Sequence, residues 1–311
     1  MDKQLSVVGA LTQWLFKEHR SPVVTLYDIG YATVKIYNAR EYAGQKVKNI
    51  RAAFPRREST TAYRNELTEL GILEPRRDLP TDMSLLVSSP FKDPFDLACG
   101  IDPFCYISHL SAMEYHGLTD RFAKTIFATT LPTPQWKIRA TEKMKKDLGP
   151  ELFASFLEAN FAPLARRVVP SINKNPLNML TSKFADQGAY IVPSDRPIRV
   201  ASLGRTFVDM LRKPGLCGGM KHVLDVYREH ANIYLPLIIS EVDRHGDKIE
   251  KVRAGYILEE RCGIKNNATI ASWVQFAQRG GSRVLDPDEA YWPTFSEKWC
   301  LSINVPKEIN E

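Results

Sequence analysis

A few residues in this chain have the types and spacing for phosphate or metal-ion chemistry. Gly280, Gly281 and Ser282 precede Asp286 and Asp288, and a Gly-Ser turn followed by two carboxylates is typical of nucleotidyltransferases. Only three residues separate Ser282 from Asp286, too few for the strand and helix that such a site places between them. A proline between the two carboxylates also disrupts a shared strand face. We therefore expect an ordinary turn here.

Two further patterns are weak candidates for ligand binding. His109 and His116 are seven positions apart and share a helix face, but no carboxylate or cysteine completes a metal-ligand set. Gly218 and Gly219 open a helix whose first N–H groups could bind an anion. A packed histidine pair and a plain sharp turn are the expected outcomes.

Catalytic motifs are missing from the sequence. It contains no GxxxxGK[ST] loop, GxGxxG fingerprint, GxSxG elbow or HExxH helix. The nearest approach to a metal-dependent nuclease is Gln135-Trp136-Lys137 with Asp120 upstream, which lacks the usual Glu-x-Lys pair. We predict a protein that is not an enzyme and uses no metal or cofactor, and keep a DNA-directed nuclease as a third hypothesis.

The positive charge of the chain is concentrated near its N-terminus. Residues 1–80 contain 13 Lys and Arg against 9 Asp and Glu, and the remaining 231 residues hold 29 against 27. Within residues 20–64 the count is 9 against 3, which equals the net charge of +6 of the whole chain. A localised basic surface suits a polyanion, because each contacted phosphate releases counterions.

Apolar spacing and capping residues predict the first elements. Residues 4–18 form an amphipathic helix, 22–24 a short strand, and Thr25 caps a brief second helix through Ile29. Ala43, Val47, Ile50 and Phe54 predict a helix over residues 40–54 with a basic polar side.

A helix over residues 60–70 follows, capped by Ser59 or Thr60 and stopped by Gly71. Residues 72–74 and 83–87 can pair as strands, with Arg76-Arg77-Asp78 at the connecting tip. A helix followed by a basic-tipped hairpin predicts a winged helix-turn-helix over residues 1–88. Whether the helix at 40–54 or that at 60–70 enters the major groove stays open.

Side-chain chemistry then assigns the expected contacts with DNA. Short polar side chains would approach bases, namely Thr60, Thr61 and Asn65. Basic side chains would contact phosphates, namely Lys46, Lys48, Arg51, Arg56, Arg57, Arg64, Arg76 and Arg77.

Residues 89–311 predict a mixed α/β C-terminal domain that could divide near residue 190, so the expected fold class is α+β. Residues 88–104 are expected to be a linker or a first loop, and residues 135–190 support no interpretation. A helix over 108–116 ends at Gly117, and Ser202 caps a helix over 203–211 that carries a surface ion pair between Arg205 and Asp209. Further elements are expected as a strand over 125–131, a strand over 198–201, a helix reaching His230, a helix around 253–259 and strands over 282–285 and 299–305.

Four sequence blocks of this region occur in an informative order, namely YISHLSAMEYHGL, IRVASLGRTFVDMLRKPGLCGG, RAGYILEE and KWCLSINV. Together they resemble the AbiEi-type antitoxin family, bacterial regulators of phage-defence toxin–antitoxin operons. The most specific block contains Arg205, Thr206, Asp209, Gly218 and Gly219. The helix at 40–54 and the long segment 135–190 depart from the family.

The resemblance implies an N-terminal winged helix that represses its own operon and a C-terminal domain that counteracts a nucleotidyltransferase-like toxin. We therefore expect double-stranded DNA at its own promoter as one partner and the toxin as another, with direct contact left open. A protein-interaction adaptor that does not bind DNA is the alternative. No apolar run suggests a membrane span, and the five widely spaced cysteines suggest mostly buried free thiols in the cytoplasm.

Overall fold

The computed structural model describes residues 5–185, 188–278 and 283–305, and the chain divides into two compact units. The predicted boundary near residue 88 does not coincide with this division, because the chain passes between the units several times. The first unit contains Met1–Cys105, Thr130–Lys183 and Val192–Ile198, and the second contains Tyr106–Thr129, Phe184–Ile191 and Arg199–Glu311.

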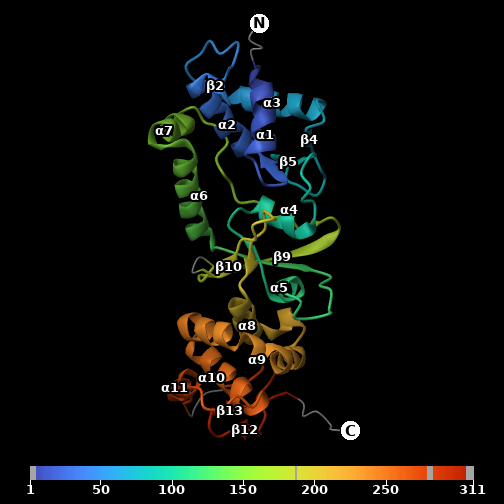
Figure 1. Cartoon of the computed structure of the whole chain (residues 1–311), viewed down its shortest axis with the longest axis vertical. Coiled ribbons are helices and arrows are strands. Elements are labelled where there is room, and N and C mark those ends of the chain that lie inside the picture. Colours follow the sequence, from blue (N-terminus) through green and yellow to red (C-terminus); the bar gives the residue numbers. More distant parts are fainter. Residues whose placement is uncertain (1–4, 186–187, 279–282, 306–311) are drawn as a thin grey trace. The chain divides into compact units, whose positions relative to one another are not determined.

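The N-terminal part of the first unit is a small sheet with three helices (Figure 1). Its elements are α1 (Val7–Lys17), β1 (Val23–Thr25), α2 (Leu26–Ala39), α3 (Arg57–Glu69), β4 (Leu73–Glu74) and β5 (Met83–Leu86). The strands are antiparallel in the order β1-β5-β4. The predicted helix at 4–18, the strand at 22–24 and the strand pair at 72–74 and 83–87 are confirmed.

Local sequence signals explain where these helices begin and end. Thr25 and Asp28 form a capping box at the start of α2, which runs ten residues beyond the predicted end at Ile29. Helix α3 begins earlier than predicted, with Arg56 as its N-cap residue. Gly71 then adopts a φ of 68°, the left-handed conformation that was expected to stop this helix.

The predicted helix at 40–54 is wrong. Two short strands, β2 (Glu41–Tyr42) and β3 (Gln45–Lys46), form a hairpin here, and residues 48–56 follow as a loop. Ala43 and Gly44 have φ values of 49° and 76°, which an α-helix cannot accommodate. Val47 bridges to Leu5 in a parallel pairing, so its apolar side chain is buried through a long-range contact rather than along a helix face.

Helix α2 is buried on two sides. Ile29, Ala32 and Ile36 pack into a core with α1, α3 and the sheet. Tyr27 and Val34 pack instead into a second core with residues of α6 (Thr133–Leu148) and α7 (Pro150–Glu158). Segments 120 residues apart in the sequence therefore share one unit, in which the Tyr27 hydroxyl donates to the Asp147 carboxylate over 2.7 Å.

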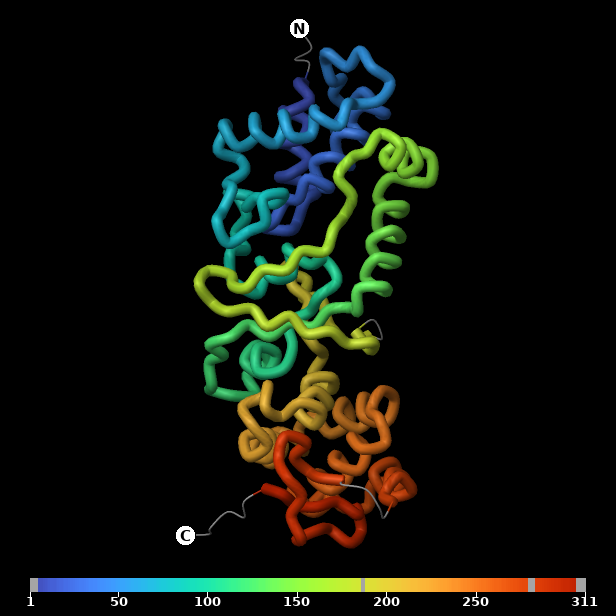
Figure 2. Tube along the Cα trace, turned by 180° about the vertical axis from the view of Figure 1, so that it is seen from behind, coloured from blue at the N-terminus to red at the C-terminus, as the bar shows by residue number. Residues whose placement is uncertain are grey.

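Three further elements complete the first unit. Residues 88–104, predicted as a linker or loop, contain helix α4 (Pro94–Ile101), which starts with a capping box of Asp93 and Asp96. Strands β8 (Ser171–Ile172) and β9 (Asn175–Thr181) form a hairpin. In both views this hairpin lies beside the loop that joins β4 to β5 (Figures 1 and 2).

The second unit combines short strands with a helical core. The bounds of its elements are β6 Tyr106–Ile107, α5 His109–Tyr115, β7 Ile126–Thr130, β10 Tyr190–Ile191, β11 Val200–Ala201, α8 Leu203–Arg212, the 3₁₀-helix η1 Pro214–Cys217, α9 Met220–His245, α10 Lys248–Tyr256, the π-helix η2 Ile257–Arg261, α11 Ala268–Ser272, the 3₁₀-helix η3 Trp273–Phe276, β12 Phe295–Ser296 and β13 Leu301–Ser302. Strands β10, β11, β6 and β7 are neighbours in that order.

Several sequence expectations hold in this unit. Ser202 caps α8 by accepting from the backbone N–H of Arg205, and α5 is followed by Gly117 with a φ of 65°.

Other elements differ from the sequence prediction in their length. Helix α9 continues fifteen residues past the predicted end at His230, and the closing strand is only two residues long. Of the predicted strand at 282–285, Ser282 lies outside the described residues, and Val284 makes an isolated bridge to Ser302.

The chain is thus a mixed α+β protein with several small sheets. Across its described ranges, no helix combines the length and the apolar character needed to cross a bilayer.

The close approach of α10 to Trp299 gives a first prediction. A Cβ atom at Gly255 would collide with the fully buried Trp299 ring. We expect Gly255→Ala to lower the free energy of unfolding by about 1–3 kcal/mol, the usual cost of overpacking. In a Trp299→Leu background the same substitution should cost less, because the ring that it strikes is gone. Denaturant titration measures both, and an equal cost in the two backgrounds would refute the collision.

Candidate nucleic-acid interface

Helix α3 presents an exposed face whose N-terminal half is basic and polar. Arg56 and Arg57 at its start are exposed, as are Thr61 and Asn65 one and two turns further on. Residues four apart lie on one side of a helix, so Arg57, Thr61 and Asn65 form a single row. The positive charge of this row suits phosphates. Its amide and hydroxyl groups can hydrogen-bond to base edges.

Thr60 does not belong to this face. It is 5% exposed and lies seven residues before Leu67, which is 0% exposed, so both side chains point into the core. The expectation that Thr60 approaches bases is therefore corrected, because a buried hydroxyl cannot reach a groove. Leu70, at the other end of the helix, is 60% exposed.

The basic residues predicted on a helix at 40–54 lie on the hairpin and loop that precede α3. Lys46, Lys48 and Arg51 are all exposed. The backbone of this segment is held by hydrogen bonds between Leu5 and both Lys46 and Lys48. The three cations thus lie on an anchored hairpin and loop, and not on a helix.

Two predicted phosphate contacts are used inside the protein. The Arg64 guanidinium donates to the carbonyl of Thr81 over 2.6 Å, which ties α3 to residues 75–82, called here the β4–β5 loop. Arg76 makes two hydrogen bonds to the Asp78 carboxylate, of 2.9 and 2.6 Å, and its side chain is only 21% exposed. Its neighbour Arg77 is exposed. Of the two arginines at the tip of this loop, Arg77 is the one presented to solvent.

The Asp78 carboxylate is the centre of this internal network. Burial by itself would raise its pKa, but hydrogen bonds from Arg76 and from the backbone N–H of Asn173 outweigh burial and hold the pKa below its usual value. Asp78 is therefore ionised at neutral pH and keeps Arg76 in place. The sequence offered a signal for the pair, since Asp78 follows Arg76 by two positions, but none for Asn173.

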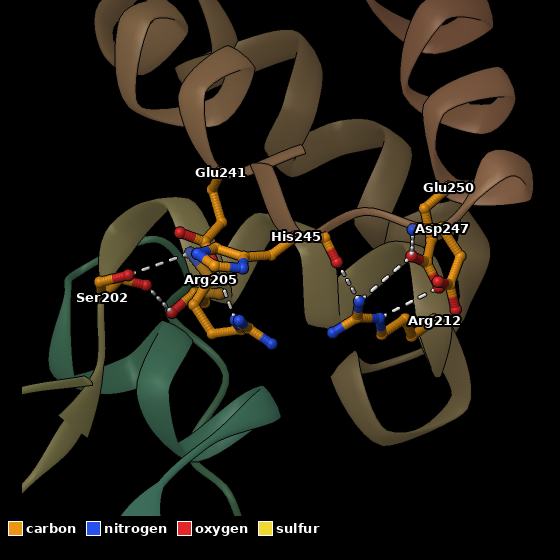
Figure 3. A network of polar contacts seen from close by, with 8 residues as sticks. Ser202, Arg205, Arg212, Glu241, His245, Asp247 and Glu250 are labelled. Atoms are coloured by element: carbon orange, nitrogen blue, oxygen red, sulfur yellow. Dashed lines mark hydrogen bonds and ion pairs between the residues drawn. The ribbon is translucent and has the colours of Figure 1, made fainter. Parts of the chain in front are cut away.

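Arg205 and Arg212 of helix α8 take part in a network of polar contacts in the second unit (Figure 3). Arg205 is 0% exposed and donates from Nε to the Glu241 carboxylate on α9 over 2.8 Å. Arg212 binds Glu250 through Nε and Nη2, and donates to the carbonyl of His245 over 2.7 Å. The predicted surface ion pair of Arg205 with Asp209 is thus wrong, because both side chains are buried and Arg205 pairs with Glu241.

Asp209 lies near both arginines of this network without forming an ion pair with either. Burial raises its pKa to about 7, and the nearby Arg205 and Arg212 offset burial only in part. Each of those guanidinium groups already binds another carboxylate, so Asp209 has no cation to itself. One of its oxygens, Oδ2, and the Nη2 of Arg205 are buried without a hydrogen-bond partner.

Glycines of the motif permit this packing. A Cβ at Gly204 would lie 2.6 Å from the carbonyl oxygen of Leu237, so α8 and α9 can cross closely only with glycine there. Gly218 and Gly219 have φ values of 90° and 91° in the turn that opens α9. Thr206 donates its hydroxyl to the carbonyl of Ser202. The motif residues therefore act first as a framework.

The four sequence blocks of the resemblance meet in this unit. His116 of the first block hydrogen-bonds the carbonyl of Ala201 in the second over 2.7 Å. Arg253 of the third block donates from Nη1 to the carbonyl of Leu211 in the second over 2.9 Å. Gly255 of the third block faces Trp299 of the fourth. Segments from the four blocks therefore contact one another within this unit.

The remaining chemical candidates are separated or hidden. His109 is buried, which lowers its pKa to about 3, and its Nδ1 lies 2.9 Å from the Ser108 hydroxyl, while His116 is bound elsewhere. Trp136 of the nuclease-like segment is buried and donates to Asp102. Gly280, Gly281 and Ser282 lie outside the described residues. Within the ranges that the structure describes, no cluster of three His, Cys, Asp or Glu side chains could hold a metal ion.

Comparisons with known proteins find similarity to solved structures. No family model matches the chain, and no curated protein is similar to it. Among solved structures, the chain is similar to the RV2827C protein from Mycobacterium tuberculosis, with 11% sequence identity and a TM-score of 0.48. The alignment covers 95% of this chain and 90% of that one.

The raised pKa of Asp209 makes stability depend on pH. Its folded-state pKa of about 7 lies above the roughly 3.9 of an unfolded aspartate. The folded protein therefore holds a proton that the unfolded chain has lost, so the contribution of Asp209 to stability falls as the pH rises from about 4 to about 7. The buried His109, with its pKa lowered to about 3, acts in the opposite direction over most of this range, so the contribution of Asp209 is measured as a difference between variants. Asp209→Asn should gain stability relative to the unaltered protein between pH 4 and pH 7 in denaturant titrations, whereas Asp225→Asn on α9 should keep the pH profile of the unaltered protein. A pH profile that Asp209→Asn leaves unchanged would contradict this role of Asp209.

Proposed function

We propose that residues 1–88 form a winged helix-turn-helix that binds double-stranded DNA, and that the protein is a transcriptional autorepressor and antitoxin. The observation that carries the DNA-binding part is the coincidence of an element order with a surface. The order α1-β1-α2-α3-β4-β5, with the β2–β3 hairpin inserted between α2 and α3 and the strands arranged β1-β5-β4, supports a winged helix. Its third helix is the one whose N-terminal half is exposed, basic and polar.

Helix α3 is the element that fits the major groove best. The segment at 40–54 is not a helix, so the choice between two recognition helices falls to α3. Recognition helices contact base edges mainly through their N-terminal residues. Here the N-terminal half offers Arg57 and Thr61, with Asn65 just past the middle of the helix. The exposed acid of this half, Glu58, lies 3.9 Å from Arg57, whereas Glu66 and Glu69 nearer the C-terminal end are exposed acids that would repel phosphates.

Exposed cations in the segments before and after this helix suit the DNA backbone. Lys46 in β3 and Lys48 and Arg51 in the following loop precede α3, and Arg77 lies on the β4–β5 loop, which takes the place of the wing. Phosphate contacts of this kind position a protein on the duplex, and base contacts then select the sequence.

The antitoxin part of the proposal rests on the resemblance alone. The motif residues Arg205 and Asp209 are buried, so they support the fold of the second unit rather than offering a surface to a toxin. Any direct contact with a toxin would use other residues of that unit.

A protein-interaction adaptor is a second candidate, favoured by one observation. Tyr291, Trp292 and Phe295 are 56%, 40% and 54% exposed within one short stretch of the second unit. Exposed aromatic clusters are typical of protein-binding surfaces. Retained partner binding by a protein that shows no affinity for DNA would favour this candidate.

Removal of the two arginines at the start of α3 tests the proposal. We expect Arg56→Ala/Arg57→Ala to weaken binding to the DNA upstream of the gene by on the order of tenfold per lost phosphate contact near 0.1 M salt. The slope of log affinity against log salt should become shallower by about 0.9 per contact. Fluorescence anisotropy across a salt series measures both quantities.

The matched control carries the same loss of charge on α6, as Lys137→Ala/Lys146→Ala, and should bind like the unaltered protein. Scrambled DNA of equal length separates sequence preference from general attraction. Equal binding by the arginine variant and the control would sink the α3 assignment, and absence of binding by the unaltered protein at low salt would sink DNA binding altogether.

Substitution of the two adjacent arginines of the β4–β5 loop should affect different properties, stability for Arg76 and DNA binding for Arg77. Arg76→Ala leaves Asp78 without its cation and should lower the free energy of unfolding by about 1–2 kcal/mol. Arg77→Ala changes an exposed side chain and should alter stability by less than about 0.5 kcal/mol, yet reduce the salt slope of DNA binding by about 0.9. Thermal unfolding and anisotropy on both variants check this pair, and a reversed pattern would contradict the structural roles given to them.

A further inference from the structure

The β8–β9 hairpin is fastened to the β4–β5 loop by side chains from both. Arg76 donates from Nη2 to the Asn173 side-chain oxygen, and the backbone N–H of Asn173 donates to Asp78 over 3.0 Å. A few residues before the hairpin, Arg167 holds Asp82 through three hydrogen bonds of 2.7 to 3.1 Å. The loop is therefore fixed by a segment about 90 residues later in the chain.

A tight turn places one lysine at the tip of this hairpin. Asn173 and Lys174 both have positive φ values, 50° and 67°, as a two-residue type I′ turn requires. Lys174 is exposed. The Asn173 side-chain amide also donates to the carbonyl of Lys92 over 3.3 Å, which brings the backbone of a second exposed lysine to the same place.

Acidic side chains at this junction are paired with internal arginines. Asp78 binds Arg76, and Asp82 binds Arg167. Asp93, next to Lys92, is half-exposed and lies 3.7 Å from Arg196, which already binds Asp96. Because Asp78 and Asp82 are neutralised, the exposed cations Arg77, Lys92 and Lys174 outnumber Asp93, the one of these three carboxylates that has no cation to itself.

We propose that the β8–β9 hairpin acts as a second wing, which extends the DNA-binding surface so that Lys174 and Lys92 contact backbone phosphates beyond those reached by Arg77. This inference rests on the proposed DNA binding. The kind of contact follows from the chemistry: two flexible ammonium groups on a turn suit phosphate oxygens and carry no planar fork for base edges. The added hairpin would lengthen the protected DNA on the wing side without changing the sequence preference.

The junction also holds the first wing in one position before DNA arrives. Arg64 anchors the loop to α3, while Asn173 and Arg167 anchor it to the hairpin and its approach. A loop that is ordered in advance loses less conformational entropy on binding. The two hairpins would therefore meet the duplex as one preformed surface.

The experiment compares Lys92→Ala/Lys174→Ala with the unaltered protein, using the DNA upstream of the gene. We expect the salt slope of log affinity to become shallower by about 1.8, twice the value for one phosphate contact, while preference over scrambled DNA is retained. Hydroxyl-radical footprinting should show protection lost at one flank only. Lys92→Arg/Lys174→Arg keeps both charges and should restore the slope and the flank, and Lys137→Ala/Lys146→Ala on α6 is the charge-matched control.

The outcomes separate this inference from the proposed function. A slope and footprint equal to those of the α6 control would overturn the second wing while DNA binding stands. Failure of the unaltered protein to bind DNA at low salt would overturn both. The lysine variant should unfold at the same temperature as the unaltered protein. A shallower slope of log affinity against log salt then results from lost phosphate contacts and not from unfolding.

Discussion

Burial of helix α2 on two opposite sides is the constraint on which the first unit depends. One side packs with α1, α3 and the small sheet, and the other packs Tyr27 and Val34 against residues of α6 and α7. Gly30 contributes by leaving room for Phe161, which would lie 3.2 Å from a Cβ at that position. A helix buried on both sides offers no exposed face to a ligand. The proposed contact with a DNA groove therefore rests on α3, which has an exposed face.

Local signals allowed much of this architecture to be predicted from the sequence. Thr25, Ser202, Gly71 and Gly117 act through their own backbone and the next few residues, so their effect can be read directly. The segment at 40–54 was predicted wrongly, because its apolar residues are spaced as in a helix but do not share one buried face: Val47 is buried, Ile50 and Phe54 are half-buried, and Ala43 is exposed. Phe54, for instance, packs edge-on against Phe161, and no local pattern contains that contact.

For the candidate site, residue type predicted exposure better than it predicted what each residue contacts. Eight of the eleven proposed DNA contacts are exposed, but Arg64, Arg76 and Thr60 are used by the fold. Charge counts cannot distinguish an arginine that faces solvent from one that a nearby carbonyl or carboxylate has already bound. Arg205 shows the same limit in the second unit, since its i+4 neighbour Asp209 suggested a surface pair, whereas Glu241, 36 positions later, is its partner.

Internal ion pairs thus play opposite roles in the two units. In the first unit, Arg76 and Arg167 bind and neutralise Asp78 and Asp82. The cations of this segment that stay exposed are then offset by fewer acidic side chains. In the second unit two arginines are shared among two buried acids, Asp209 and Glu250, and the partly buried Glu241, and burial raises the pKa of Asp209 to about 7. A buried pair contributes little net stability but is costly to break, because one charge is then left alone. Such pairs therefore fix geometry more than they add stability, and the geometry fixed in the first unit is that of the loop beside α3.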